Sequence, residues 1–211
     1  MKNKFTFQLL AMDVARIVCI PLIAILRIKR YTPEGKKYSK KLVGGAIIAA
    51  NHTAFIDPFV VGVTFWQRRL YFLAAEVVMQ GKLRSFLLKG VGAIKIDRNS
   101  TDIEAIKKSI GVLKEGHPLL IFPQGGINKD DNVENIKSGA VLIALQAGVP
   151  IIPMHILPRS AWYKSRTVII GNEINPKEFC AKKIPSTADI NNITQALAEE
   201  LERCKNANGK E

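Results

Sequence analysis

A histidine and an aspartate five residues apart are the side chains of this chain best placed to do chemistry. His52 and Asp57 lie just after the apolar run 45–50, whose small and β-branched residues are typical of a buried strand. Pro58 favours a helix that begins beside Asp57, itself a good N-cap residue. A tight turn between strand and helix can bring the imidazole within hydrogen-bond reach of the carboxylate. An imidazole held in this way acts as a general base toward an alcohol, although such a pair is also typical of a capped, solvated turn.

A cation follows a later strand-like run. The stretch Gly92–Arg98 ends in Asp97 and Arg98, and ligands of open α/β sheets gather at the carboxyl ends of the strands. The guanidinium of Arg98 offers a planar fork of donors that matches a phosphate or a carboxylate. An ion pair of Arg98 with Asp97 or Asp102 is the structural alternative.

A third stretch, Ile121–Asn128, also follows a strand-like run and contains Gln124, Gly125 and Gly126. Glycines let a chain approach a ligand closely, and we expect the backbone N–H groups of these two to donate to it. An ordinary glycine turn would contain the same residues. Lys137 flanks the stretch as a further cation.

The runs that precede these residues alternate between strand and helix patterns, and this alternation predicts an α/β domain whose largely parallel sheet is flanked by helices. The strand-like runs are residues 46–50, 70–74, 93–96, 118–122, 150–156 and 167–170. The helix-like runs are residues 58–65, 76–89, 102–114, 136–147 and 186–204.

Residues 1–43 differ in character from the rest of the chain. They carry ten Lys and Arg against two Asp and Glu, a net +8 of the chain's +13. The longest uncharged apolar run, Ile17–Leu26, is shorter than the roughly 20 residues that cross a bilayer. The pattern predicts an amphipathic helical segment in the membrane interface, followed by a domain over residues 44–211. A core helix with a solvated basic end would look the same.

Several other classes of chemistry find no support in the sequence. There is no G-x-S-x-G or H-E-x-x-H motif, and His117 and His155 have no ligand spacing with His52, so we expect neither a metal nor a cofactor. The three cysteines form no disulfide framework, which suits a reducing compartment. The net charge favours an anionic partner, but aromatic residues do not alternate with the basic clusters, so no nucleic acid is expected.

Taken in order, these stretches resemble the motifs of the glycerolipid acyltransferases, the lysophosphatidic acid acyltransferase family. His52–Asp57 is similar to the family's H-x4-D motif, and Gly92–Arg98 is similar to its second motif. Phe122–Gly125 resembles the third motif, and Val149–Pro153 resembles the fourth. The segment that contains Lys137 also resembles the family. The match runs over residues 45–156, about half of the chain.

The resemblance implies acyl transfer from a thioester of acyl carrier protein or coenzyme A to the hydroxyl of a lysophospholipid, 1-acylglycerol-3-phosphate above all. His52 would act as the base and Asp57 would orient it. The implied binding residues for the acceptor are Arg98, Gln124, Gly125, Gly126 and Lys137. An anionic membrane surface is the further expected partner, and we expect the protein at the cytoplasmic face of the cell membrane, peripheral or monotopic.

The third motif departs from the family pattern at three positions. Gln124 stands where the family has Glu, Gly126 where it has Thr, and Ile127 where it has Arg. The sequence therefore supports the chemistry at His52 more strongly than it supports the identity of the acceptor. An acyltransferase for another lysolipid or an amino-lipid, and a non-catalytic membrane lipid-binding protein, are the alternatives.

Overall fold

The computed structural model describes residues 10–14, 17, 27–97, 102–128, 136–158, 165–180 and 185–207. Within these residues, seven strands form one sheet in the order β1-β7-β6-β2-β5-β3-β4. Neighbouring strands are parallel except for β6 and β7. The strands are β1 Lys29–Tyr31, β2 Ile47–Ala50, β3 Tyr71–Ala75, β4 Ala93–Ile96, β5 Leu119–Ile121, β6 Ile151–Ile156 and β7 Thr167–Ile170.

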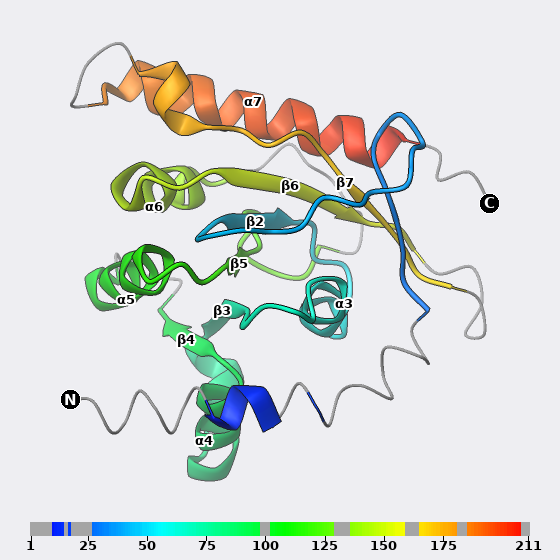
Figure 1. Cartoon of the computed structure of the whole chain (residues 1–211). Helices are drawn as coiled ribbons and strands as arrows, with labels where there is room; N and C mark the ends of the chain where they lie inside the picture. Colours follow the sequence, from blue (N-terminus) through cyan, green and yellow to red (C-terminus); the bar gives the residue numbers. More distant parts are fainter. Residues whose placement is uncertain are drawn as a thin grey trace.

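Helices cover both faces of this sheet (Figure 1). The described helices and 3-10 turns are α3 Asp57–Thr64, η1 Glu76–Met79, α4 Lys82–Gly90, α5 Ile103–Lys114, α6 Gly139–Ala147, η2 Pro176–Phe179 and α7 Thr187–Asn206. This architecture confirms the predicted α/β fold with a largely parallel sheet.

Alternate residues of the central strand β2 supply two separate cores. Ile47 and Ala49 pack with residues of α5, α6 and α7, whereas Ile48 and Ala50 pack with residues of α3. All of β2 is buried. Because side chains of a strand point to opposite faces in turn, a strand that is covered on both faces must be apolar throughout. This is the reason that the run 45–50 has no polar residue.

The structure corrects the sequence-based elements in three places. The helix expected over residues 76–89 is instead η1 and α4, separated at Gly81, whose φ of +93° lies in the region that favours glycine. The helix expected from residue 136 begins at Gly139. The strand β1 was missed because it is a three-residue edge strand that contains Lys29 and Arg30 instead of an apolar run.

In the predicted N-terminal membrane segment, residues 1–9, 15–16 and 18–26 lie outside the described residues, and these include nearly all of its longest apolar run. Residues 10–14 and 17 are helical, with Leu10, Val14 and Ile17 exposed and Met12 buried. The strand β1 belongs to the sheet through its parallel pairing with β7. Among the described residues no helix is both long enough and apolar enough to span a bilayer.

Candidate active site

His52 and Asp57 form a hydrogen-bonded pair at the carboxyl end of β2. The Nδ1 atom of His52 lies 3.1 Å from Oδ2 of Asp57. Asp57 is fully buried, and 8% of His52 is exposed. Because an ionised carboxylate only accepts hydrogen bonds, Nδ1 carries the proton and Nε2 keeps its lone pair. The pair therefore has the form of an oriented general base.

The turn between β2 and α3 is closed by the same carboxylate. Oδ2 of Asp57 accepts hydrogen bonds from the backbone N–H of Thr53, at 2.8 Å, and of Ala54, at 2.7 Å. The expectation that Asp57 is the N-cap was wrong, because Ile56 occupies that position and Asp57 is the first helical residue. The carboxylate reaches back over the turn, where it holds the loop and the imidazole at once.

The imidazole is also fixed from the neighbouring strand. Phe122, directly after β5, stacks on the His52 ring with the centroids 4.0 Å apart and the planes inclined by 14°. The backbone N–H of Asn128 donates to the carbonyl of His52 at 2.7 Å, and the His52 N–H donates to Oε1 of Gln124 at 3.4 Å. The carboxyl ends of β2 and β5 are adjacent in the sheet, so the third motif packs against the first.

Asn51 ties the same strand end to β6. Its side-chain amide donates to the carbonyl of Ile156 at 3.2 Å, and its Oδ1 accepts from the N–H of Ile156 at 2.7 Å. This bidentate contact joins two strand ends one residue before His52. It limits the freedom of the backbone that carries the base.

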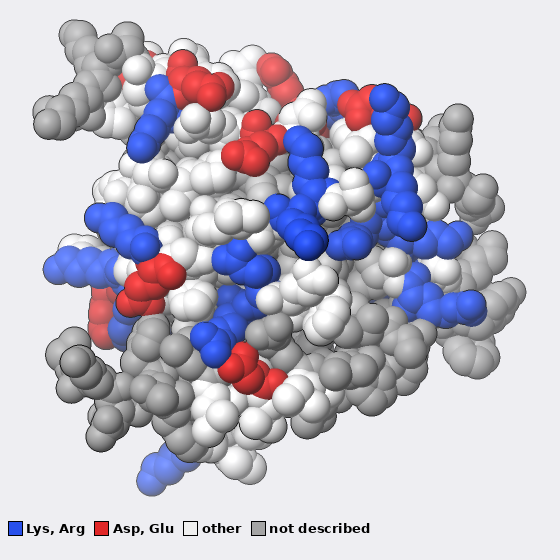
Figure 2. Space-filling view, in the orientation of Figure 1, with Lys and Arg blue, Asp and Glu red and all other residues white. Residues whose placement is uncertain are grey.

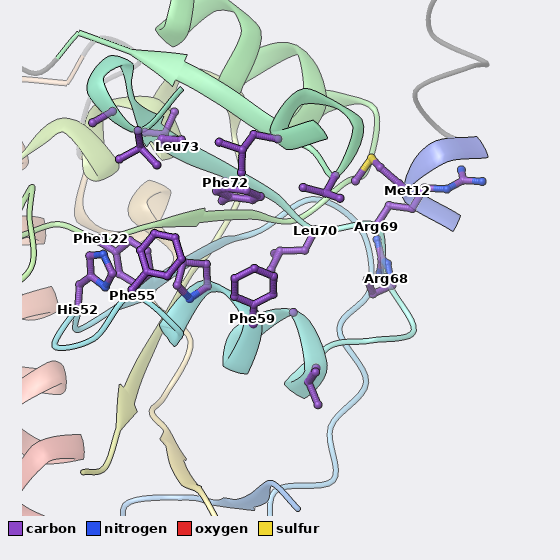
Figure 3. A pocket seen from close by; sticks show the side chains of 18 of the residues that line it. Met12, His52, Phe55, Phe59, Arg68, Arg69, Leu70, Phe72, Leu73 and Phe122 are labelled. Atoms are coloured by element: carbon purple, nitrogen blue, oxygen red, sulfur yellow. The ribbon is translucent and has the colours of Figure 1, made fainter. Parts of the chain in front are cut away.

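A long apolar cavity begins at His52 (Figure 3). Its volume is about 290 Å³. His52, Phe55 and Phe122 lie at one end with Leu73, and Phe72, Phe59 and Leu70 lead from there toward Met12, Arg68 and Arg69 at the other. The walls come from α3, β3, η1 and α4. An elongated apolar ligand can lie here with its reactive end beside the imidazole.

The far end of the cavity is built from residues with structural roles. Arg69 forms a two-point ion pair with Asp13, at 2.9 and 2.5 Å, and so fastens the helical residues 10–14 to the domain. Arg68 donates to the carbonyls of Leu42, Gly44 and Gly116. The ion pair brings buried Met12 against this end of the cavity.

The predicted acceptor-binding residues are only partly assembled. Gly125 turns the chain with a φ of +78°, but its N–H donates to the Phe122 carbonyl at 3.0 Å, so the expected free donor at this position was wrong. The exposed side chain of Lys137 lies over Gly125, with Nζ 3.2 Å from the site of a Cβ there. Gly126 lies in the same turn.

Gln124 and Ile127 face different surroundings. Gln124 lines a second cavity of about 10 Å³ together with Asn51 and His155, whereas Ile127 lines the large cavity beside His52. Arg98 lies outside the described residues. The next described residue is Asp102, whose carboxylate accepts hydrogen bonds from the N–H groups of Asp97 and Ala105. These hydrogen bonds lower the pKa of the Asp102 carboxyl.

The described cysteines do not take part in this site. Burial raises the pKa of the Cys204 thiol to about 12, and Cys180 follows η2, which packs against α6 and α7. Within the described ranges, no group of three or more His, Cys, Asp and Glu side chains is arranged to hold a metal ion.

Two features of the site were not found from the sequence. The sequence places Phe122 in the third motif, but its stacking on His52 depends on the pairing of β2 with β5. The cavity walls come from apolar residues that looked like ordinary core. One pattern could have indicated the cavity. The aromatic residues at 55, 59, 66 and 72 are more numerous than the packing of one short helix against one strand requires.

An oriented imidazole at the end of a long apolar cavity is the arrangement of an enzyme that handles acyl chains, and comparisons with known proteins agree. The family model described as "Acyltransferase" matches residues 30–157. A 1-acyl-sn-glycerol-3-phosphate acyltransferase of Bacillus subtilis is 27% identical over 179 residues, which cover 81% of this chain and 88% of that protein. One from Limnanthes douglasii is 30% identical over 165 residues, which cover 72% of this chain and 57% of that protein.

The fold has a solved counterpart. The crystal structure of the 1-acyl-sn-glycerophosphate (LPA) acyltransferase PlsC from Thermotoga maritima superposes with a TM-score of 0.62 at 17% sequence identity, covering 100% of this chain and 86% of that one. The chain belongs to the acyltransferase family.

Proposed function

We propose that this enzyme transfers a fatty acyl group from an acyl carrier protein or coenzyme A thioester to the hydroxyl of a lysophospholipid. The proposed acceptor is 1-acylglycerol-3-phosphate, and the product is then phosphatidic acid. One observation carries the proposal: the His52–Asp57 pair lies at the end of a cavity with apolar walls of the kind an acyl chain needs.

The pair performs the transfer in two steps. Nε2 of His52 takes the proton of the acceptor hydroxyl as its oxygen attacks the thioester carbonyl, and Asp57 stabilises the imidazolium that forms. The tetrahedral intermediate then collapses, the C–S bond breaks, and the leaving thiolate takes the proton from the imidazolium. No Cys or Ser neighbours His52 in the sequence, so we propose direct transfer without an acyl-enzyme.

The cavity supports a fatty acyl group over a small one. Burial of each methylene contributes about 0.8 kcal/mol. An acyl chain whose carbonyl lies at His52 would contact apolar side chains along its length, from Phe55 to Leu70. With the acyl carbon beside Nε2, the hydrocarbon tail points toward Met12.

The acceptor assignment rests on the relatives and on two cations. The Bacillus subtilis and Limnanthes relatives are named for 1-acyl-sn-glycerol-3-phosphate. Lys137 lies at the third motif, and no carboxylate of the described residues pairs with its ammonium. Arg98 is the second candidate for the phosphate. Ile127 supplies no charge where the family has Arg. Among the motif residues, an acceptor phosphate would therefore depend on Lys137 and Arg98.

The charge distribution supports the proposed partners. Basic side chains are spread over the face in Figure 2, where acidic ones are fewer, as the net charge of +13 leads one to expect. Such a surface attracts an acidic carrier protein, the phosphates of coenzyme A and an anionic bilayer. We place the protein at the cytoplasmic face of the cell membrane. Binding to anionic vesicles that weakens as salt rises is the expected result.

The test is turnover by the purified chain, with both thioester donors and a panel of lysolipids, and products identified by mass spectrometry. We expect phosphatidic acid from 1-acylglycerol-3-phosphate, and a loss of roughly 10²–10⁴-fold in His52→Ala, the scale of a positioned general base. His117→Ala is the matched control. His117 lies just before β5, its ring contacts Tyr71, and it does not line the cavity.

The outcomes separate the alternatives. Product from another lysolipid or an amino-lipid alone, still dependent on His52, would change the acceptor and keep the mechanism. Unchanged turnover in His52→Ala would refute the mechanism. Absence of thiol release from both donors with every acceptor would favour a lipid-binding protein.

A further inference from the structure

The helix α4 turns its apolar residues away from the domain. Leu83, Phe86 and Leu87 are 71%, 61% and 57% exposed. Their spacing of three and four residues places them on one face of the helix, which we call the outer stripe of α4. No residue of α4 is fully buried, and Ser85, Leu88 and Gly90 are its half-buried residues. A surface helix of a globular domain normally shows the reverse orientation.

Basic residues border the outer stripe of α4, and acidic residues are absent from its neighbourhood in the chain. Lys82, Arg84 and Lys89 are all exposed. Residues 77–96 contain no Asp or Glu. An apolar face flanked by Lys and Arg is the pattern of a helix that lies in the interface of an anionic bilayer. A second protein with an ordinary mixed surface would not select this charge pattern.

The outer stripe of α4 also lies beside the reactive cavity. Leu88, on the inner side of the helix, lines that cavity, as do Val78 before the helix and Val91 after it. On the other side of the cavity, Phe55, Phe59 and Trp66 line it and are themselves exposed. Exposed apolar groups therefore lie on both sides of the cavity, where lipid can cover them.

We propose that α4 is a membrane-docking helix, distinct from the N-terminal segment, whose outer stripe inserts into an anionic bilayer beside the opening of the cavity. The chain would then take its lipid substrate laterally from the bilayer, between α3 and α4. The proposal rests on the proposed action on lipids at a membrane, but on no particular acceptor or donor.

The experiment uses the full chain and vesicles of phosphatidylglycerol and phosphatidylethanolamine. Phe86→Trp places a fluorophore on the outer stripe of α4, and lipids brominated in the acyl chain quench it where it enters the bilayer. Phe179→Trp is the matched control, since Phe179 is 37% exposed on η2. This turn packs against α6 and α7, and α7 lies at the opposite end of the molecule from α4 (Figure 1).

We expect strong quenching in Phe86→Trp and none beyond the background of the native tryptophans in Phe179→Trp. Phe86→Ser should weaken vesicle binding by roughly tenfold, which corresponds to about 1.4 kcal/mol, and Phe179→Ser should bind like the unaltered chain. Replacement of Lys82 and Arg84 by Gln should weaken binding to the anionic vesicles and leave binding to phosphatidylcholine vesicles unchanged.

Three results would overturn the proposal. Quenching of Phe86→Trp that is no stronger than that of Phe179→Trp would show that the outer stripe of α4 does not insert selectively into the bilayer. A dimer in solution that Phe86→Ser dissociates would make it a contact between copies of the chain. Emission of Phe86→Trp that is shielded from acrylamide without lipid would mean that the chain itself covers it. Turnover of detergent-dispersed substrate, measured in parallel, tests the proposed function independently of these outcomes.

Discussion

Replacement of Asp57 by Asn tests whether the carboxylate serves catalysis or only closes the turn. The single oxygen Oδ2 accepts from His52, Thr53 and Ala54. The amide oxygen of Asn can accept the same three hydrogen bonds, so the turn and the imidazole tautomer are both retained. The negative charge beside the imidazole is the only large loss.

The size of that loss follows from the distance. Nδ1 and Oδ2 are 3.1 Å apart, and two unit charges about 4 Å apart interact by about 4 kcal/mol at an effective dielectric constant near 20. This energy is present only when Nε2 of His52 has also taken a proton and the imidazole is positively charged, as in the transition state. We therefore expect kcat to fall by roughly 10³-fold in Asp57→Asn, with a smaller change in KM.

Stability should change little, for two opposing reasons. Oδ1 of Asp57 is buried with no hydrogen-bond partner among the described residues, so an amide nitrogen there leaves unsatisfied donors at a cost of about 1–3 kcal/mol. Removal of a buried charge offsets part of this cost. We expect a Tm within about 5 °C of the unaltered chain.

The measurement is steady-state turnover beside thermal unfolding, with Asp189→Asn as the control. Asp189 also accepts a backbone N–H, that of Ser186 at 2.8 Å, but at the start of α7. Its Asn variant should keep full activity. A kcat for Asp57→Asn within about threefold of the unaltered chain, at equal stability, would refute the charge argument.

Three further substitutions test the rest of the site. Gln124→Glu should keep activity and change acceptor preference on the lysolipid panel by less than about tenfold, because either side chain offers an oxygen to the His52 N–H. Activity on 1-acylglycerol-3-phosphate in the Glu form alone would contradict this expectation. Arg98→Ala should raise the acceptor KM by roughly one to two decades, the effect of losing a hydrogen bond to a charged group, and equal changes in both KM values would make Arg98 structural. Ala74→Leu fills part of the cavity wall, and in a series of acyl donors it should disfavour longer chains by about fourfold per methylene excluded; a uniform loss over the series would count against the acyl chain lying there.

Six of the seven strands and the order of the motifs were predictable because they depend on local pattern. A strand that is buried on both faces has to be largely apolar along its length, as β2 is throughout and β6 is except at His155. His52 and Asp57 could be paired from the sequence because the short connection between a strand and a helix can fold back on itself, here over residues 51–56. The strand β1 could not be found in this way, since three residues at a sheet edge carry too weak a pattern.

Only the tertiary structure decided what surrounds the base. The stacking of Phe122 on His52 requires β5 to lie beside β2, and the cavity requires α3, β3 and α4 to meet without filling the space between them. The orientation of α4 is the clearest case. Its sequence is amphipathic whichever way it faces, because periodicity fixes the angle between the polar and apolar sides of a helix but not the side that meets the domain. That choice is made by the packing of Leu88 and its neighbours around the cavity, which leaves Leu83, Phe86 and Leu87 exposed.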